Sequence, residues 1–435
     1  MMMMMMMMIF MIPMCLVNLK LIIQFILIYI YMYLLFNDAN FFFSKISYFL
    51  GLDLFSFYLV LMGLLICSYM DISMMGCLSK ALFNFTNLIL MLLMYLIFFS
   101  LSFIYMYMSF EFVLFPLMVL ILGWGYQPER LLAGMYMYIY TIMVSLPLLV
   151  MILIIYFSYY SLFFDCMIYT SKNFIIHLIL TLVFMMKLPI YLLHFWLPKA
   201  HVQAPVSGSM ILAGLMLKIG GYGLVRVMFI YEFLFMTYSY IWFSISLLGL
   251  IIISLVCMIQ GDFKCLIAYS SVSHMCMVVL GLISMSNWGL WGSYLLMLGH
   301  GFCSSGLFYL MNLYYNFSLS RSFFINKGLM NYVPSGSMFL FIMCLFNMSC
   351  PPSVNFLSEF MILISMENYW FNSYIYFFVF SFFCACFSYY MYMYNQHGLY
   401  HNLYSYSMFN LVNFLCLTMH LFPLVFYPLM ILSII

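Results

Sequence analysis

The chain has 435 residues, of which 69% are hydrophobic and 5% are charged, and its net charge is +2. A soluble domain carries about 25% charged residues, so this composition excludes a water-exposed surface and predicts a polytopic membrane protein. The small net charge also argues against a nucleic-acid partner. The 13 cysteines include no C-x-x-C pair, which favours buried, inert cysteines over a zinc or iron–sulfur site.

Long apolar stretches follow one another along the whole chain, and a bilayer-spanning helix needs about 20 apolar residues. The charge-free intervals are 54–70, 81–110, 131–164, 233–261, 265–320, 328–358 and 368–435, and the two longest hold two spans each. The other expected spans are Met1–Val17, Leu21–Phe36, a short one over Glu111–Leu122, and two lysine-bearing helices between 181 and 224. The sequence therefore predicts one all-α transmembrane domain, 1–435, with about 14 helices.

The two lysine-bearing helices hold the least expected residues of the chain. Lys187 stands two residues before Pro189, and Lys218 stands two residues before Gly220. A charged residue in the middle of a bilayer costs about 2.5–3.5 kcal/mol on insertion scales. Such residues usually face the interior of a helix bundle, pair with one another and mark an ion or proton route.

Glu111 and Glu359 are the other two charged residues that do not fit into loops. Glu111 is the natural partner for Lys187, because a Lys–Glu contact that opens and closes would release and rebind a proton. The alternative interpretation is a buried ion pair that only fixes the register of the helices. Four such residues, two of each sign, favour the proton route.

Proline residues predict breaks in two of the spans. Pro189 removes a backbone donor and clashes with the carbonyl four residues back, so we expect the first lysine-bearing helix to break near Met185–Met186. Freed backbone carbonyls at membrane depth are tolerated only beside protein or a water-filled cavity. Pro351-Pro352 open another span in the same way, and Glu359 follows about two turns later.

Three histidines lie in or beside these spans. His274 and His300 stand in charge-free spans, and histidine is suited to proton relay because it titrates near neutral pH. His194 follows Lys187 by seven residues, on about the same helix face. Each histidine has a second interpretation as a packed hydrogen-bonding group, and for His194, a secondary proton-transfer candidate, the two interpretations stay equally open.

The loop charges predict an orientation. If the loops after odd-numbered spans share one side, that side collects seven basic residues: Lys20, Lys80, Arg130, Lys199, Lys264, Arg321 and Lys327. Lys45, Lys172 and Arg226 would lie on the other side, among four acidic residues. By the positive-inside rule the first set faces the matrix or cytoplasm. With 14 spans, both termini then lie on the opposite side.

Six motifs in order resemble a known family: FEFVLFPLMVLILGWGYQPERLLAG (110–134), MKLPIYLLHFWLPKAHVQAPVSGSMILAG (186–214), LKIGGYGL (217–224), DFKCLIAYSSVSHM (262–275), GHGFCSSGLFYL (299–310) and PPSVNFLSEF (351–360). They are similar to the antiporter-like, proton-pumping subunits of mitochondrial NADH:ubiquinone oxidoreductase, respiratory complex I, and among these to chain 4. The close resemblance covers about residues 100–365, and the ends of the chain match mainly in hydropathy.

The resemblance implies an antiporter-like fold with two inverted five-helix repeats, about 83–230 and 239–395, each with one broken helix. It also implies a role for each charged or histidine residue of the motifs. Glu111 and Lys187 would form the coupled pair, and Lys218 would be the central relay. His274 and His300 would be the link, and Glu359 would end the horizontal proton route.

The resemblance further implies that this chain binds no cofactor. NADH, FMN, iron–sulfur clusters and ubiquinone would be bound by partner subunits, where the redox chemistry would occur. The expected partners are other membrane-arm subunits, including sibling antiporter-like subunits, and membrane lipids. The expected location is the mitochondrial inner membrane, with both termini on the intermembrane-space side.

Two features depart from the family pattern. Gln203 stands in HVQAP where relatives often have HVEAP, so a role for an acid at this position is not expected. The eight-methionine start is also unlike the family, and one interpretation is an extension of the reading frame.

Two other function classes remain as alternatives. The same lysines could serve a stand-alone or multi-subunit cation/proton antiporter, to which the family is related. A haem-binding membrane electron carrier would use His194 and His201 as ligands. Pro198 between these histidines opposes the haem interpretation, because it places His201 in a loop.

Overall fold

The computed structural model describes residues 2–17, 19–36, 43, 45–74, 79–167, 173–399 and 409–430. The chain divides into two compact units. The first unit comprises Met1–Lys187 and Gln203–Tyr238, and the second comprises Leu188–Val202 and Ser239–Ile435.

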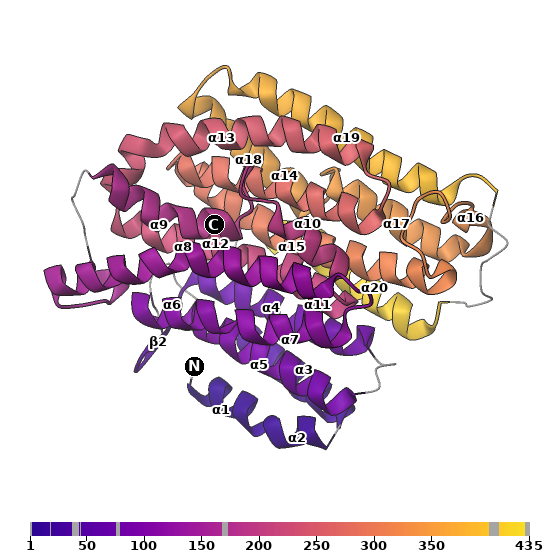
Figure 1. Ribbon diagram of the computed structural model, residues 1–435, viewed down its shortest axis with the longest axis horizontal. Helices are drawn as coiled ribbons and strands as arrows, with labels where there is room; N and C mark the ends of the chain where they lie inside the picture. Colours follow the sequence, from indigo (N-terminus) through magenta and orange to yellow (C-terminus); the bar gives the residue numbers. More distant parts are fainter. Residues whose placement is uncertain are drawn as a thin grey trace. The chain divides into compact units, whose positions relative to one another are not determined.

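The first unit is built of helices and one small two-stranded antiparallel sheet (Figure 1). Its elements are α1 (Met2–Phe10), α2 (Ile12–Leu16), α3 (Lys20–Leu35), β1 (Lys45–Ser47), β2 (Leu50–Leu52), α4 (Leu54–Ser73), α5 (Lys80–Phe99), α6 (Phe103–Phe112), α7 (Leu114–Trp124), α8 (Arg130–Tyr159), α9 (Phe174–Lys187), α11 (Val206–Ile211) and α12 (Leu217–Ile230). Helix α12 packs against α9, and a Cβ at Gly223 would collide with the ring of Phe184. Glycine here permits the close helix approach that membrane bundles favour.

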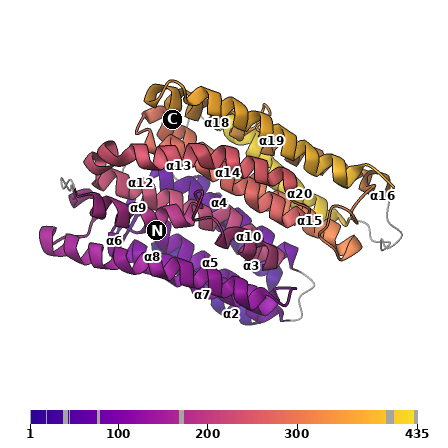
Figure 2. The same cartoon turned by 45° about the horizontal axis from the view of Figure 1, so that its top comes forward.

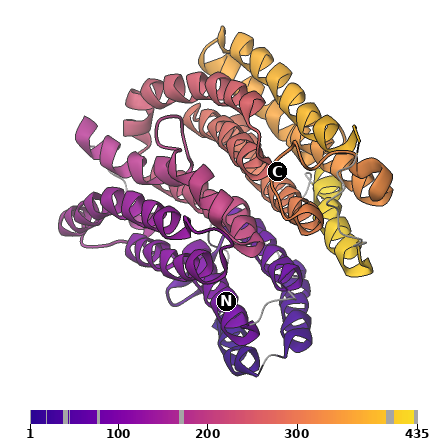
Figure 3. The ribbon, with the colours of Figure 1, turned by 45° about the vertical axis from the view of Figure 1, so that its right-hand side comes forward.

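The second unit is all-helical in the residues that the structure describes. Its elements are α10 (Trp196–Gln203), α14 (Phe263–Ile283), α15 (Asn287–Ser318), α16 (Leu329–Tyr332), α17 (Pro334–Asn347), α18 (Val354–Tyr369), α19 (Ser373–Gln396) and α20 (Leu411–Phe426), and α13 (Glu232–Ile259) runs from the first unit into it. Helix α15 is the centre of this unit, because it packs against α14, α17, α18 and α20. The contact of α18 with α19 can be followed in Figure 2, and that of yellow α20 with orange α15 in Figure 3.

The number of apolar helices agrees with the sequence. In the described ranges, nine helices are long and apolar enough to cross a bilayer, and five more are apolar but shorter. The all-α polytopic class is confirmed, and the two sets together number 14, the same as the number of helices that the sequence predicts. The span Val206–Ile230 and the span formed by α15 each contain an 18-residue stretch that is wholly buried, whereas α8 exposes many large apolar side chains, as expected for a helix that faces lipid.

The first helix break lies later than predicted. Helix α9 continues through Met185–Met186, ends at Lys187, and is followed by α10 only from Trp196. The residue before a proline is disfavoured in the helical conformation, so the chain leaves the helix at Leu188, before Pro189 can clash with a preceding carbonyl. Lys187 is therefore the last helical residue, directly beside the break.

The predicted short span over Glu111–Leu122 is wrong. Helix α5 ends at Phe99, and α6 and α7 together form one span, Phe103–Trp124. The hydroxyl of Ser102 accepts the backbone N–H of Tyr105 at 3.5 Å and so caps the new helix. The Ser102 cap divides the charge-free interval 81–110 between two helices. Glu111 consequently lies inside a span and not at its start.

The second break agrees with the sequence. Helix α17 ends at Asn347 and α18 begins at Val354, so Pro351-Pro352 lie in the connection. The hydroxyl of Ser353 accepts the backbone N–H of Phe356 at 3.4 Å and caps α18. Glu359 is placed in the second turn of α18, as expected.

Candidate functional site

Lys187 stands at the end of α9 in an apolar environment. Its side chain is buried, and its Nζ lies 4.5 Å from the centroid of the Phe110 ring. The Phe110 ring in turn packs edge-on against Phe184, with 6.1 Å between centroids. Nζ is buried without a hydrogen-bond partner among the described residues. The face of an aromatic ring attracts a cation, so the Phe110 ring stabilises this ammonium group.

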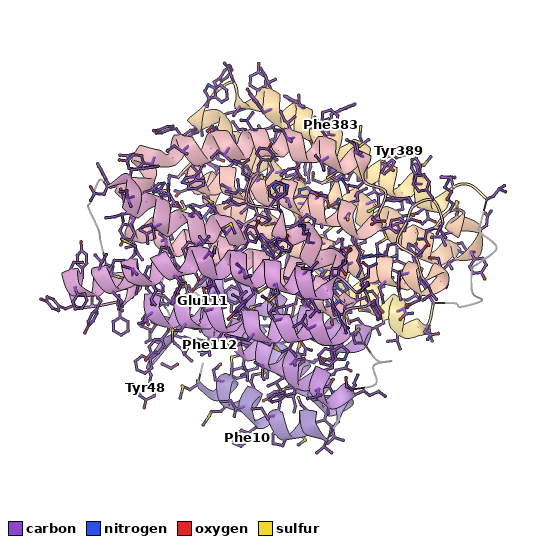
Figure 4. The ribbon with its side chains drawn as sticks, viewed as in Figure 1. Phe10, Tyr48, Glu111, Phe112, Phe383 and Tyr389 are labelled. Atoms are coloured by element: carbon purple, nitrogen blue, oxygen red, sulfur yellow. The ribbon has the colours of Figure 1, made fainter. Side chains whose placement is uncertain are left out.

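Glu111 lies next to Phe110 on α6, and Figure 4 labels it. Its carboxylate interacts electrostatically with Lys187, but the ion pairs within 4.0 Å among the described residues do not include this pair. The Oε1 atom is buried, and no residue that the structure describes forms a hydrogen bond with it. The hydroxyl of Ser145 on α8 interacts with the carboxylate, while it also donates to the carbonyl of Ile142 at 3.2 Å. Opposite charges are thus brought near each other and held short of contact.

Lys218 lies on α12 and is fully buried. Its ammonium donates a hydrogen bond to the carbonyl of Ala213, with 2.5 Å between Nζ and O. Ala213 belongs to a π-helical turn, Leu212–Met216, that joins α11 to α12. Such turns often occur at functional sites and re-aim backbone carbonyls. The sequence suggests no partner for Lys218, because no sequence pattern predicts the π-helical turn that presents this carbonyl.

The second unit brings together three of the predicted residues. His274 on α14, His300 on α15 and Glu359 on α18 are all buried. The rings of the two histidines have centroids 5.5 Å apart. His274 Nδ1 lies 3.5 Å from Glu359 Oε1, although the two groups are not aligned as a hydrogen bond. These contacts form a continuous polar cluster inside an apolar unit.

Two residues complete this cluster that the sequence does not single out. The hydroxyl of Ser349, in the break before α18, donates to Glu359 Oε2 at 2.6 Å. The thiol of Cys384 on α19 lies 3.9 Å from His274 Nε2 and donates to the carbonyl of Asn347 at 3.5 Å. Serine and cysteine are common in this chain, and only the fold distinguishes these two from the others.

His194 lies in the connection between α9 and α10. Its ring stacks on Phe195, with centroids 4.6 Å apart, and on Tyr191 at 6.0 Å, and it meets the edge of Tyr269 at 6.1 Å. The packed-histidine interpretation expects a hydrogen bond as well, but Nδ1 of His194 is buried without a hydrogen-bond partner among the described residues. The secondary proton-transfer role of His194 stays a prediction.

The expected loop position of His201 is wrong. His201 lies in α10, whose third residue is Pro198, and a proline is tolerated in the first helical turn. The His201 ring stacks on Phe308 with centroids 4.8 Å apart and 1° between ring planes. Among the described residues, no group of three or more His, Cys, Asp or Glu lies together as a metal site.

Arg226 is a buried charge that the sequence places in a loop. It forms an ion pair with Asp53, the residue before α4. Its Nη2 and Nε also donate to the hydroxyl of Tyr222, at 2.8 Å and 3.0 Å. The Tyr222 hydroxyl donates to the carbonyl of Phe98 at 2.9 Å. The network ties α12 to the start of α4 through Asp53 and to α5 through the Phe98 carbonyl, so it is suited to fixing the register of these three helices.

Comparison with known proteins supports one family. The model of the transmembrane part of NADH:quinone oxidoreductases and Mrp antiporters matches residues 100–388. Two solved structures share the fold. One is respiratory complex I from Thermus thermophilus with bound NADH, with a TM-score of 0.84, 19% identity, and coverage of 98% of this chain and 95% of the other. The other is an archaeal membrane-bound sulfane sulfur reductase, with a TM-score of 0.79, 18% identity, and coverage of 94% and 70%.

Three curated relatives are named NADH-ubiquinone oxidoreductase chain 4. The protein of Ceratitis capitata is 45% identical over 417 residues, which cover 94% of this chain and 91% of the relative. The protein of Aedes aegypti is 43% identical and covers 89% and 88%. The protein of Locusta migratoria is 43% identical and covers 95% of both chains. The chain therefore belongs to the NADH-ubiquinone oxidoreductase chain 4 family.

Proposed function

We propose that this chain translocates protons as a membrane-arm subunit of respiratory complex I, in the mitochondrial inner membrane. Family membership and the 14 apolar helices support this function. NADH oxidation and ubiquinone reduction would take place in partner subunits, which would carry NADH, FMN, iron–sulfur clusters and ubiquinone. The partners include other membrane-arm subunits. A stand-alone cation/proton antiporter is less favoured, since relatives that match most of their length carry the chain 4 name.

The observation that carries the proposal is the arrangement of Glu111 and Lys187. Both groups lie inside the first unit. Among the described residues, each has a polar atom without a hydrogen-bond partner, and the two are not in contact as an ion pair. Desolvation disfavours the charged form of both groups, and approach of the two charges restores it. A small movement that closes the gap would hold the proton on Lys187, and opening the gap would release it.

Lys218 would take part in the same unit as a relay. Its ammonium donates a hydrogen bond to the Ala213 carbonyl, and this bond fixes the direction in which the proton is held. We therefore assign Lys218 to passing a proton on, and Lys187 to switching.

His274, His300 and Glu359 would conduct protons within the second unit. The Nδ1 of His274 faces the carboxylate of Glu359, and its ring lies beside that of His300. A histidine accepts a proton on one ring nitrogen and releases one from the other. We therefore assign His274 to exchanging protons between its two neighbours.

The test is proton translocation by the assembled complex in proteoliposomes, measured per NADH oxidised. Lys187→Met and Glu111→Gln remove one charge each and keep approximate side-chain volume. Loss of the positioned proton-transfer group is expected to slow pumping by about 10²-fold or more, with slower NADH oxidation as a consequence of coupling. Lys80→Met is the matched control, because Lys80 is exposed at the start of α5. Normal pumping by an assembled Lys187→Met complex would refute the switch.

We also infer that both termini lie on the intermembrane-space side. The test uses Cys166, which is exposed in the short helical turn Phe164–Cys166 after α8. A membrane-impermeant thiol reagent is expected to label it in mitochondria whose outer membrane has been removed. Cys166→Ser is the control that identifies the labelled residue. Labelling only from the matrix side would reverse the orientation.

A further inference from the structure

A second buried polar cluster lies in the first unit, away from the residues assigned to proton transfer. Asp71 stands in the last turn of α4, and Asn84 and Asn87 stand near the start of α5. All three side chains are 3–4% exposed. Lys20, at the start of α3, interacts electrostatically with Asp71. The side-by-side packing of α3, α4 and α5 can be followed in Figure 1.

The hydrogen bonds of this cluster fix how one amide points. Asn87 Nδ2 donates to Asp71 Oδ1 at 2.5 Å and to the carbonyl of Cys67 at 3.2 Å. With Nδ2 used as the donor, Asn87 Oδ1 is a buried acceptor that no described residue satisfies. The orientation is set by partners on α4, so exchanging the O and N atoms of this amide would break both bonds.

Asn84 and Lys20 leave further polar atoms unsatisfied. Both Oδ1 and Nδ2 of Asn84, and Nζ of Lys20, are buried without a hydrogen-bond partner among the described residues. An unsatisfied buried polar group is costly, and native proteins usually satisfy it with protein or ordered water. Two acceptors, the Oδ1 atoms of Asn84 and Asn87, and two donors, Asn84 Nδ2 and Lys20 Nζ, therefore lack partners among the described residues.

A cavity of about 10 Å³ is lined by Asp71, Asn84, Asn87 and apolar residues that include Ile23 and Met91. A cavity needs about 10–15 Å³ to hold one water, which in turn needs two to four polar partners. The space thus fits a single water.

The charge of the site distinguishes water from a cation. A bound cation is held by oxygen atoms alone, and it would be repelled by the ammonium of Lys20. A water can donate to the oxygens of Asn84 and Asn87 and accept from the Asn84 amide. We propose that Asp71, Asn84 and Asn87 form an internal water-binding site between α4 and α5, with Lys20 as the counter-charge of its carboxylate.

The direct test is a density map of the intact complex at a resolution that shows ordered water. The expected result is one peak within hydrogen-bond distance of Asn84 and of Asn87 Oδ1. An empty cavity would overturn the proposal. A peak with metal-like distances to oxygen atoms only would overturn it in favour of a cation site.

Thermal stability of the assembled complex gives a second test, because the midpoint temperature of unfolding should shift in opposite directions for a hydrated and a dry site. Asn84→Leu keeps the side-chain size and removes the amide. In a dry site the substitution would remove unsatisfied polar atoms and raise the midpoint temperature, whereas in a hydrated site it displaces a satisfied water and lowers it. A downward shift is expected, and an upward shift would overturn the proposal.

Thr86→Val is the matched control for this measurement. Thr86 is buried on the same helix, donates to the carbonyl of Phe83 at 2.9 Å, and does not line the cavity. The expected downward shift for Asn84→Leu exceeds that of this control. Equal shifts for the two variants would mean that α5 responds to any lost polar group, and would overturn the assignment of a site.

Discussion

The two broken helices carry opposite charges, and the two charges stand at different distances from the helix ends. Lys187 is in the last turn of α9, before its break, and Glu359 is near the start of α18, after its break. The C-terminus of a helix favours cations, and this effect falls off within the last turn. The break after α9 therefore makes the charge of Lys187 less costly at membrane depth. Glu359 is the sixth residue of α18, beyond the first turn, so its charge depends on side-chain partners instead.

The two sites differ in how completely their charges are satisfied. Glu359 accepts a hydrogen bond from Ser349 and faces His274. Lys187 has a ring face and a distant carboxylate, with no hydrogen-bond partner among the described residues. A well-satisfied charge is held in one place, whereas a poorly satisfied one responds to small movements. This contrast is why the switch is assigned to the first unit and steady conduction to the second.

The largest expected effect comes from reversing the charge at the first break. Lys187→Glu would place an anion at the C-terminus of α9, near the carboxylate of Glu111. A buried charge without its partner costs about 3–5 kcal/mol, so the assembled complex is expected to be lost. Native gel electrophoresis measures assembly, with Lys187→Met as the control that keeps it. Normal assembly of the Lys187→Glu variant would break the argument from the helix end.

A smaller effect is expected from removing the central group of the second site. His274→Phe keeps a ring beside His300 and Phe380 but leaves Glu359 without its imidazole. Proton translocation is expected to fall by about 10²-fold, the lower range for a positioned proton-transfer group, while assembly persists.

The matched control for this variant is His177→Phe in the first unit. His177 is equally buried and lies against Phe235, with ring centroids 5.0 Å apart. Pumping by this control is expected to be normal. Equal losses in the two variants would show that any buried histidine sustains pumping through packing, and would remove the assigned role of His274.

The smallest expected effect tests how strongly the two carboxylates, Glu359 and Glu111, depend on the serine hydroxyls beside them. Ser349→Ala removes the direct donor to Glu359 and is expected to destabilise the protein by about 1.5–3 kcal/mol, the range for a hydrogen bond to a charged group. Ser145→Ala should cost less, because that hydroxyl also donates to a backbone carbonyl in its own helix. Thermal unfolding of the assembled complex compares the two. A larger loss for Ser145→Ala would contradict the comparison.

Much of this architecture follows from the sequence because membranes impose simple rules. Apolar length predicts the number of spans, and Pro351-Pro352 and Pro189 predict breaks near their observed positions. The exact end of α9 does not follow, since a helix can stop before a proline or kink around it. The end of α5 at Phe99 does not follow from the sequence either, because a serine cap carries no charge and hardly changes the hydropathy.

The missed polar residues have a common physical reason. Asp71 and Arg226 stand close to the ends of their spans, where a count of charges assigns them to loops. Only the packing of neighbouring helices over them makes them buried. Cys384 has no distinctive spacing at all, and its relation to His274 arises from the contact of α19 with α14.

The number of residues in the π-helical turn before Lys218 determines the direction in which the Lys218 side chain points from the helix axis. A turn of this kind contains one residue more than the matching α-helical turn, and one residue corresponds to about 100° of rotation. The faces of α11 and α12 are therefore offset from each other within a single span. Loss of one residue from Leu212–Met216 would turn every side chain of α12 about the helix axis. The position of the lysine within the bundle thus depends on chain length over a short segment as much as on its own identity.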